Sequence, residues 1–542
     1  MKTPPGVTEA DFARALEQLA AVVGPQWVFS KEDDVATYRD AYSPFVGEAE
    51  ERIASAAVAP ESVEQVQKVL AIANRLRIPL YTISTGRNLA YGGSAPAYSG
   101  SVILDLKRMN RVLEVSEEYA YALVEPGVSY FDLYRHIREK GLKLWIDNPD
   151  PGWGSLVGNA LDHGAGRTPL PYRDHFDAHC GMEVVLANGD VVRTGMGAMP
   201  NSQLWQQTKY GPGPLLDGIF SQSNYGVVTK MGFWLMPEPE ASMAGTVRLR
   251  HHDDVIAFVR VLSSLMYSNI VDCNFTVASP VFAASADADK ERLLVKNDGG
   301  TAQEWDQYAA ARGMEHFWET ELRFYGPPKI MAAKWEYVRE RFARIPGASF
   351  ADGATTHFPL TDEQVDAITD STEASFYGIP SLGVFTGLAR GELTGASEGI
   401  EVTGHLDASP VVPISGEALL KAQRVFNRIF HEAGLPRGLG FALNYHWRTF
   451  IMFQGLRLTN DKAYNARVRA AYERCMQAIA DNGWGFYRAH NAFHDKLMGL
   501  LSYNDHALPR LHSVLKDALD PNGILSAGRY GIWPRHLRKD RA

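Results

Sequence analysis

The stretch that decides the interpretation of the sequence reads Ser84-Thr85-Gly86-Arg87-Asn88-Leu89-Ala90-Tyr91-Gly92-Gly93. It directly follows an apolar run over residues 78–83 that is typical of a short buried strand. Small residues in such a loop let backbone N–H groups approach a pyrophosphate. Its spacing is neither the G-x-G-x-x-G of a Rossmann fold nor a P-loop, because no G-K-[ST] follows. Taken alone, the loop also fits an ordinary turn after a strand, which is the commoner case.

Two further loops of small residues lie in the same part of the chain. One covers residues 148–159 and reads Asn-Pro-Asp-Pro-Gly-Trp-Gly-Ser-Leu-Val-Gly-Asn. The other covers residues 221–229 and comes directly before a predicted strand. Three such loops in one α/β region are more than chance turns explain. We therefore expect a nucleotide-cofactor site in a fold that is not of the Rossmann type.

The first 240 residues alternate between predicted strands and helices. The predicted elements are a helix starting at residues 60–62, a hairpin over 183–194, and strands over 102–106, 120–124 and 227–236. Asn188-Gly189 at the hairpin tip predicts a type I′ turn, because this dipeptide tolerates positive φ. Pro237-Glu238-Pro239 ends the alternation and predicts a domain boundary.

The second half of the chain has a different pattern, with longer helices and aromatic-rich strands. Helices are expected over residues 252–266, 416–433 and 461–482, the last two closed by Gly434 and Gly483. A strand is expected over 444–453, and a helix over 508–519 begins the C-terminal tail. This half therefore predicts a second domain of the α+β class.

Composition excludes several classes of protein. The 542 residues are 45% hydrophobic with a net charge of -9, which disfavours disorder and nucleic-acid binding. No run of about 18 apolar residues occurs, and the N-terminus lacks the apolar core of a signal peptide, so we expect no membrane association and a cytoplasmic location. Three scattered cysteines argue against disulfides and structural zinc. No histidine spacing typical of a metal site occurs, and none is expected.

A Tyr487-Arg488 pair follows the last long predicted helix. A phenolic O–H and a guanidinium fork together can hold a small anion. Such a pair is also commonplace, and a structural salt bridge explains it equally well.

Taken together, these motifs resemble the vanillyl-alcohol oxidase / para-cresol methylhydroxylase flavoproteins. The likeness includes the three loops, Tyr487-Arg488, and the ending Asp520-Pro521-Asn522-Gly523-Ile524 with Gly528-Arg529 and Trp533-Pro534. It implies the α+β, two-domain FAD-binding fold of that family, with an α+β cap domain. The implied division is an FAD-binding domain over 1–238, a substrate or cap domain over 239–490, and a C-terminal return to the FAD domain over 491–542.

The resemblance also assigns site residues. Tyr91, Tyr487 and Arg488 match the residues that bind the phenolate oxygen of the substrate, and Asp150 matches the carboxylate near flavin N5. His405, in Gly404-His405-Leu406-Asp407-Ala408-Ser409-Pro410, matches the histidine that is linked covalently to FAD in the oxidases. The other expected FAD contacts are Ser84, Thr85, Gly86, Arg87, Asn88, Leu89, Pro149, Gly152, Ser155, Asn159, Asn224, Gly226, Val228 and Arg529.

The implied activity is the FAD-dependent oxidation of para-substituted phenols, such as eugenol or lignin-derived 4-alkylphenols. Hydride leaves the para-carbon and gives a quinone methide, which is then hydrated or deprotonated. The electron acceptor is O2 or, alternatively, a cytochrome c, since no C-x-x-C-H places a haem on this chain. A homodimer is expected. A flavin-binding protein without catalysis is the alternative class, and it would not need Tyr91, Asp150, Tyr487 and Arg488 together.

One departure from the family concerns the predicted strand over 444–453. Trp447 and Arg448 stand where relatives place two histidines. If they line the pocket, they favour a larger phenol, such as the lignan pinoresinol. A slip of one residue would turn both side chains away from it.

Overall fold

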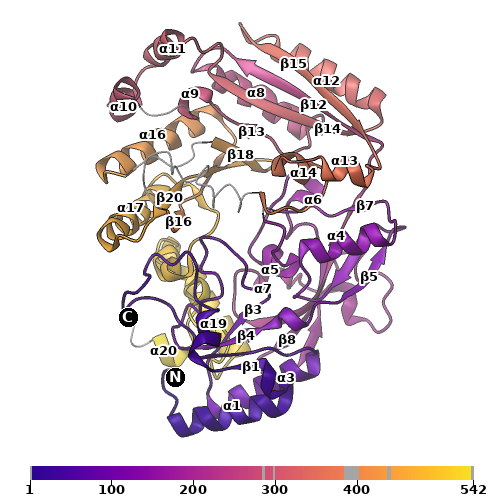
Figure 1. Ribbon diagram of the computed structural model, residues 1–542, viewed down its shortest axis with the longest axis vertical. Helices are drawn as coiled ribbons and strands as arrows, with labels where there is room; N and C mark the ends of the chain where they lie inside the picture. The colour runs from indigo at the N-terminus through magenta and orange to yellow at the C-terminus, as the bar shows by residue number, and fades with distance from the viewer. Residues whose placement is uncertain are drawn as a thin grey trace.

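The computed structural model describes residues 3–149, 151–283, 287–296, 299–383, 402–435 and 441–538. It has an α+β fold in which two halves are stacked along the long axis (Figure 1). The N-terminal strands and helices fill the lower half, the middle of the chain fills the upper half, and the last helices return to the lower half. In the described residues no helix combines the length and apolarity needed to cross a membrane.

A four-stranded sheet begins the lower half. Its order is β1-β2-β4-β3, and β2, β4 and β3 run parallel. The strands are β1 (Val28–Phe29), β2 (Ala56–Val58), β3 (Leu80–Ile83) and β4 (Val102–Asp105). Helices α1 (Glu9–Val23) and α3 (Val63–Leu76) pack together below it (Figure 1). The predicted start of α3 is confirmed, because the Ser62 side chain accepts a hydrogen bond from the Gln65 amide and caps the helix.

An antiparallel sheet of order β5-β6-β10-β8-β9 completes the lower half. Its strands are β5 (Val112–Ser116), β6 (Tyr121–Val124), β8 (His179–Leu186), β9 (Val191–Arg193) and β10 (Gly226–Trp234). The accompanying helices are α4 (Tyr130–Glu139), α5 (Leu156–Leu161), α6 (Leu170–Arg173) and α7 (Asp217–Phe220). The β8–β9 hairpin forms as predicted, but the type I′ turn is wrong. Only Gly189 has positive φ, at 90°, and its amide donates to the Leu186 carbonyl, so Ala187-Asn188 form the turn and Gly189 a bulge.

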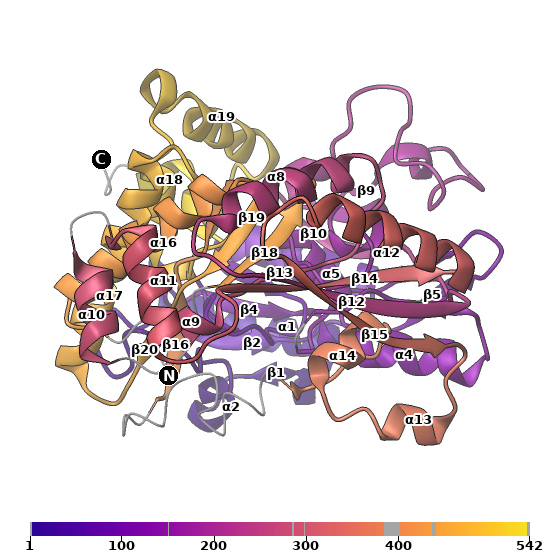
Figure 2. The same ribbon diagram turned by 90° about the horizontal axis from the view of Figure 1, so that it is seen from above.

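The upper half contains a long antiparallel sheet of order β14-β12-β15 and its helices (Figure 2). The strands are β12 (Ala241–Leu249), β14 (Trp318–Gly326) and β15 (Ser349–His357). The helices are α8 (Asp254–Tyr267), α9 (Pro280–Ala283), α10 (Ala288–Val295), α11 (Ala302–Ala311), α12 (Pro328–Phe342), α13 (Asp362–Asp366) and α14 (Ser371–Phe376). Since β12 begins near the boundary predicted after residue 238, the pattern change at Pro237 is visible in the fold. The exact domain limits stay a prediction.

A second sheet of the upper half has the order β13-β18-β19-β17-β21, beside a β16-β20 pair. The strands are β13 (Thr276–Val277), β16 (Gly404–Asp407), β17 (Pro410–Pro413), β18 (Phe441–His446), β19 (Thr449–Phe453), β20 (Gly455–Leu458) and β21 (Gly485–Phe486). Helices α16 (Gly416–Glu432) and α17 (Lys462–Asp481) pack beside them, and both end at the predicted glycines. The single strand predicted over 444–453 is wrong: it is a hairpin of β18 and β19 that turns at Trp447-Arg448.

The C-terminal segment crosses back to the first sheet. After α18 (His494–Gly499) and α19 (Tyr503–Leu519), the chain runs beside β3, where the Leu80 amide donates to the Ile524 carbonyl at 2.7 Å. The Ser526 amide returns a bond of the same length to the Leu80 carbonyl, and α20 (Arg535–Arg538) follows. The C-terminal segment therefore lies on the lower half, as the N-terminal segment does (Figure 1).

Candidate active site

A cleft runs through the lower half where the three predicted loops meet. It encloses about 1160 Å³ of empty space, part of it open to solvent. Its walls also include the C-terminal residues Ser526 and Arg529, which the return of the chain brings to β3. The predicted site residues that line it are Ser84, Thr85, Gly86, Arg87, Asn88, Tyr91, Ser155, Asn159, Asn224, Gly226, Val228, Arg488 and Arg529.

Glycines in this cleft stand where a side chain has no space. A Cβ added to Gly158 on α5 would lie 2.2 Å from the Ser84 hydroxyl oxygen. Gly86 has a φ of 66°, and a Cβ there would lie 1.9 Å from the Ser94 hydroxyl oxygen. The Asn88 side chain fixes the loop by bonding to both the amide and the carbonyl of Gly93. Gly158 and Gly86 thus let the walls of the cleft approach Ser84 and Ser94 closely.

The polar groups of the cleft fit a cofactor with phosphates and a polar ring system. Asn224 donates from Nδ2 to the carbonyls of Ser526 and Ile532 at 3.0 and 2.8 Å, while its buried Oδ1 has no hydrogen-bond partner in the part of the chain that the structure describes. Arg529 adds a guanidinium, paired with Asp162 at 2.5 Å. Bare backbone, a guanidinium and an unpaired acceptor together match the donors and acceptors of a dinucleotide such as FAD.

Tyr91 comes together with Tyr487 and Arg488, although it is remote from them in sequence; Tyr91 and Arg488 line the cleft, and Tyr487 does not. The guanidinium carbon of Arg488 lies 5.1 Å from the ring centre of Tyr91 and 4.5 Å from that of Tyr487. Arg488 Nε donates to the Asp162 carbonyl at 2.6 Å, whereas its buried Nη2 has no partner among the described residues. The residues that follow β21 are fixed by the Tyr487 amide, which donates to the Ser409 carbonyl at 3.3 Å. An unpaired guanidinium N–H between two tyrosines is suited to bind one small anion.

The surroundings set the charges of these three residues. Burial raises the pKa of Tyr91 well above its usual value, and the charge of Asp407 acts in the same direction. Burial also raises the pKa of Tyr487, so both phenols are neutral hydrogen-bonding groups. Burial works against the charge of Arg488, but Tyr487, Tyr91 and Asp162 outweigh it and raise its pKa. Arg488 is therefore a permanent cation.

His405 lies on β16, which pairs with β20, and it does not line the empty cleft. Its imidazole meets the Tyr42 ring edge to face at a centroid distance of 5.3 Å. Burial lowers the pKa of His405, and the opposing charge of Asp407 does not restore it. The imidazole is accordingly neutral and nucleophilic near pH 7.

Four of the other predicted residues are placed differently or lie outside the described part. Asp150 is outside the described residues. Leu89, Pro149 and Gly152 do not line the cleft. Gly152 instead packs against the segment at Pro380, and its amide donates to the Ser381 carbonyl at 2.8 Å. The proposed wall of Trp447 and Arg448 is wrong: Trp447 packs against the core of the upper half, and Arg448 lies over the exposed ring of Tyr267.

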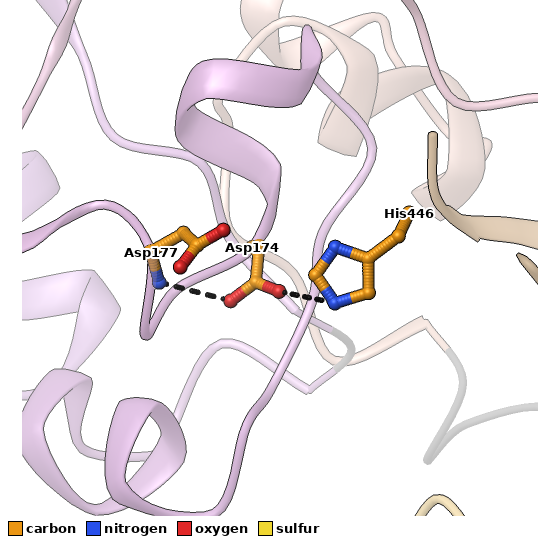
Figure 3. A group of neighbouring side chains, drawn as sticks. All are labelled: Asp174, Asp177 and His446. Carbon is orange, nitrogen blue, oxygen red and sulfur yellow. Dashed lines mark hydrogen bonds and ion pairs between the residues drawn. The ribbon is translucent and has the colours of Figure 1, made fainter. Parts of the chain in front are cut away.

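Sequence reasoning missed a second group of charges, Asp174, Asp177 and His446, which lies close together (Figure 3). His446 Nε2 is 3.0 Å from Asp174 Oδ2, and Asp174 Oδ1 accepts the amide hydrogens of Phe176 and Asp177. These bonds outweigh burial and lower the pKa of Asp174 to about 2, while Asp174 raises the pKa of His446. Asp174 thus already has partners on both oxygens, and we assign no metal to the group.

Comparisons with known proteins agree with this fold. Residues 54–195 match the FAD binding domain family, and residues 419–530 match the C-terminal domain of FAD linked oxidases. The flavoprotein subunit of 4-cresol dehydrogenase (hydroxylating) from Pseudomonas putida is 33% identical over 538 residues, which is 98% of this chain and 97% of that protein.

Solved structures give the same result. A 4-ethylphenol oxidase from Gulosibacter chungangensis, in complex with isoeugenol, superposes with a TM-score of 0.82 at 34% identity, covering 99% of this chain and 100% of that one. A p-cresol methylhydroxylase with substrate bound has a TM-score of 0.82 at 32% identity, covering 98% and 99%. Fold and cleft define an FAD-dependent oxidoreductase with two domains. The chain belongs to the vanillyl-alcohol oxidase / para-cresol methylhydroxylase family of flavoproteins.

Proposed function

We propose that this flavoprotein oxidises 4-alkylphenols, such as 4-ethylphenol, eugenol or lignin-derived phenols, by loss of hydride from the carbon para to the hydroxyl. The single observation that carries the proposal is the buried Nη2 of Arg488, which has no partner among the described residues and belongs to a guanidinium that lies over the rings of Tyr91 and Tyr487. The names of the related proteins, a 4-cresol dehydrogenase and a 4-ethylphenol oxidase, agree with it.

The arginine and tyrosines act on the ionisation of the substrate. A phenolate pushes electrons into the ring as hydride leaves the para-carbon, and a quinone methide results. Lowering the pKa of a phenol from about 10 to about 7 requires roughly 4 kcal/mol of preferential binding of the anion. Hydrogen bonds to a charged group are worth about 1.5–3 kcal/mol each, so Arg488 and the two tyrosines together can supply it.

FAD, when bound, supplies the hydride acceptor. We propose that the cleft residues Ser84–Asn88, Ser155, Asn159, Asn224, Gly226, Val228 and Arg529 hold it, and that Leu89, Pro149 and Gly152 contribute through backbone at the cleft margin. Asp150 is proposed to activate the water that adds to the quinone methide. His405 is proposed as the covalent link to FAD, because a neutral imidazole is the nucleophilic form.

The electron acceptor is proposed to be O2, with a cytochrome c as the alternative. His405 favours the oxidases, whereas the related protein named as a flavoprotein subunit favours an electron-carrying partner. The larger lignans lose their support, because Trp447 and Arg448 do not face the cluster. A homodimer and a cytoplasmic location remain expectations.

The test is a turnover assay with 4-ethylphenol, para-cresol, eugenol and pinoresinol, each in air and each under argon with cytochrome c. We expect the 4-alkylphenols to be oxidised and oxygen to be consumed. The matched control is 4-ethylanisole, in which methylation prevents ionisation, and it should not react. Oxidation of the methyl ether at the rate of the phenol would contradict the proposal, and turnover only with cytochrome c would replace O2 by the alternative.

A further inference from the structure

A second cavity lies at the seam where the lower and upper halves of the molecule meet. Its walls come from α4 and β7 (Leu144–Trp145) below, and from α13 and the segments around Pro359 and Gly378 above (Figure 1). This seam cavity encloses about 850 Å³ of empty space, part of it open to solvent, and ligand pockets typically measure about 300–1,000 Å³. Another cavity, between α8 and the start of α16, has all its walls in the upper half and does not reach the seam.

The lining of the seam cavity is largely apolar and aromatic. The Trp145 ring lies edge to face against Phe358 at a centroid distance of 4.6 Å, and Val365 of α13 adds an aliphatic side chain. Arg138 of α4 pairs across the seam with Asp362 of α13, which is exposed. Exposed ion pairs contribute little to stability, so this link can open at small cost. Such walls suit a neutral 4-alkylphenol, which is a flat ring with an apolar chain.

One face of α4 leads from the seam cavity toward Arg488. Tyr134 and Arg138 line the cavity, and Tyr130 lies on the same face of the helix, four residues before Tyr134. Burial and the charge of Asp147 raise the pKa of Tyr130, while the charge of Arg488 opposes them, so Tyr130 is near enough to Arg488 for the charges to interact. Four helical residues span only about 6 Å. The seam cavity therefore extends to within about one helical turn of a residue that senses Arg488.

The wall between the seam cavity and the FAD cleft is thin. Ile146 lines the seam cavity, and Asn159 lines the cleft. Asp147, next to Ile146, has its Oδ2 2.7 Å from His175 Nε2, and the other ring nitrogen of His175 is hydrogen-bonded to Asn159 Oδ1. Two hydrogen-bonded side chains thus connect the lining of one space to the lining of the other.

The inner end of the seam cavity is closed by a weak contact between the two halves. Asn148 Nδ2 donates to the carbonyl of Ile379, which lines the cavity, at 3.4 Å, a long distance for a hydrogen bond. Asn148 Oδ1 is buried and has no partner among the residues that the structure describes. A phenol that passes this point can donate its hydroxyl to that oxygen, which offsets the cost of leaving water.

We propose that the seam cavity is the entry site of the phenol, which binds there first and then passes between Asn148 and Ile379 to Arg488; this rests on the function proposed above. Arg488 lines the cleft that is proposed to hold FAD, so in the loaded protein the substrate needs a second route to it. The seam cavity supplies that route. No covalent bond forms or breaks on the way.

The test places a removable obstacle in the seam cavity. The native Cys180, Cys273 and Cys475 are buried, and burial raises the pKa of each thiol, so a maleimide should not label them. Val365→Cys adds an accessible thiol to the cavity wall, and pyrene maleimide attached there fills the cavity. Binding of 4-bromophenol, which has no para-alkyl hydrogen to lose, is followed in the FAD-loaded protein by stopped-flow flavin absorbance. The rates of association and dissociation and the Kd are measured.

In labelled Val365→Cys we expect association and dissociation to slow by about tenfold or more, with Kd unchanged, because an obstructed path slows both directions alike. Unlabelled Val365→Cys should match the native protein. The control is Ile330→Cys, at a 55% exposed position on α12 that does not line the seam cavity. It should match the native protein with and without the label.

Two results would overturn the entry route and leave the proposed function intact, because the phenol still binds. One is unchanged rates in labelled Val365→Cys. The other is slower association with an unchanged dissociation rate, which is a loss of affinity and not an obstructed path. A native, FAD-loaded protein that does not bind 4-bromophenol at all would instead overturn the proposed function together with the route.

Discussion

Arg488 shows how a single residue is prepared for an anion. One guanidinium nitrogen is fixed to the Asp162 carbonyl, and another is buried with no partner in the described segments of the chain. A buried donor without a partner costs about 1–3 kcal/mol or more for a charged group, a cost that a bound phenolate removes. This free-energy cost is present in the free protein and absent from the complex, and it therefore favours binding of the anion.

At the same scale, His405→Ala tests the covalent link to FAD. In the native protein we expect the yellow colour to remain with the acid-precipitated chain, because a bond to the imidazole survives unfolding. In His405→Ala the FAD should be extracted by acid. Tyr42→Phe, which keeps the ring that packs against His405, serves as the control and should retain the link. Flavin that stays with the denatured His405→Ala chain would show that another residue carries the bond.

Sequence reasoning found the residues that belong to local motifs, and missed those that pair across the fold. Tyr91 stands in a glycine-rich loop and Arg488 in a Tyr-Arg pair, and both motifs are readable locally. Asp407 is 316 residues from its partner Tyr91, and no local spacing encodes that contact. His446 meets Asp174 only because the β18–β19 hairpin projects toward the lower half. Buried carboxylates beside the predicted tyrosines can be found only once the fold is known, because the contacts join residues that are remote in sequence.

At the scale of elements, the helices predicted over residues 252–266, 416–433 and 461–482 match α8, α16 and α17 to within two residues, whereas α19 begins at Tyr503, five residues before its predicted start. Caps and glycines are the local signals that fix helix ends. Ser62 and Gly434 are examples, as the side-chain cap of α3 and the positive-φ residue after α16. Strand pairing was harder. The aromatic-rich segment over 444–453 has the composition of one strand, but it turns at Trp447-Arg448 because β19 pairs back on β18 and β17. The position of the turn depends on which strands β19 pairs with, and the sequence of the segment alone does not identify those strands.

At the scale of the molecule, the C-terminal return holds the cleft together. Lys516 is fully buried and pairs with Asp520 at 2.8 Å, while its ammonium also donates to the carbonyls of Asn224 and Leu525 at 3.0 and 2.7 Å. It thus ties α19 to the loop that carries Asn224 and to the segment beside β3. This region borders the predicted FAD cleft. Because a cofactor that binds only the folded protein stabilises it, we expect loss of the C-terminal contacts to weaken FAD binding as well.

Lys516→Met is expected to destabilise the protein by about 3–5 kcal/mol, because Asp520 is left as an unpaired buried charge. The measurement is thermal unfolding at equal flavin content. The control is Lys496→Met, since Lys496 pairs with Glu473 where both side chains are 42% exposed. Such an exposed pair is worth about 0–1 kcal/mol. Equal melting temperatures for the two variants would show that the return is not held by Lys516.

Arg488 and the two tyrosines are proposed to make the bound phenol an anion. The most direct test compares the pH dependence of kcat for the native protein and for Arg488→Ala, with saturating 4-ethylphenol as substrate. In the native protein we expect kcat to be flat near neutral pH. In Arg488→Ala the lost hydrogen bond should lower kcat at pH 7 by about ten- to a hundredfold, and kcat should then rise about tenfold per pH unit below the pKa of the bound phenol. A pH profile of kcat that Arg488→Ala leaves unchanged would contradict the binding of the substrate as a phenolate.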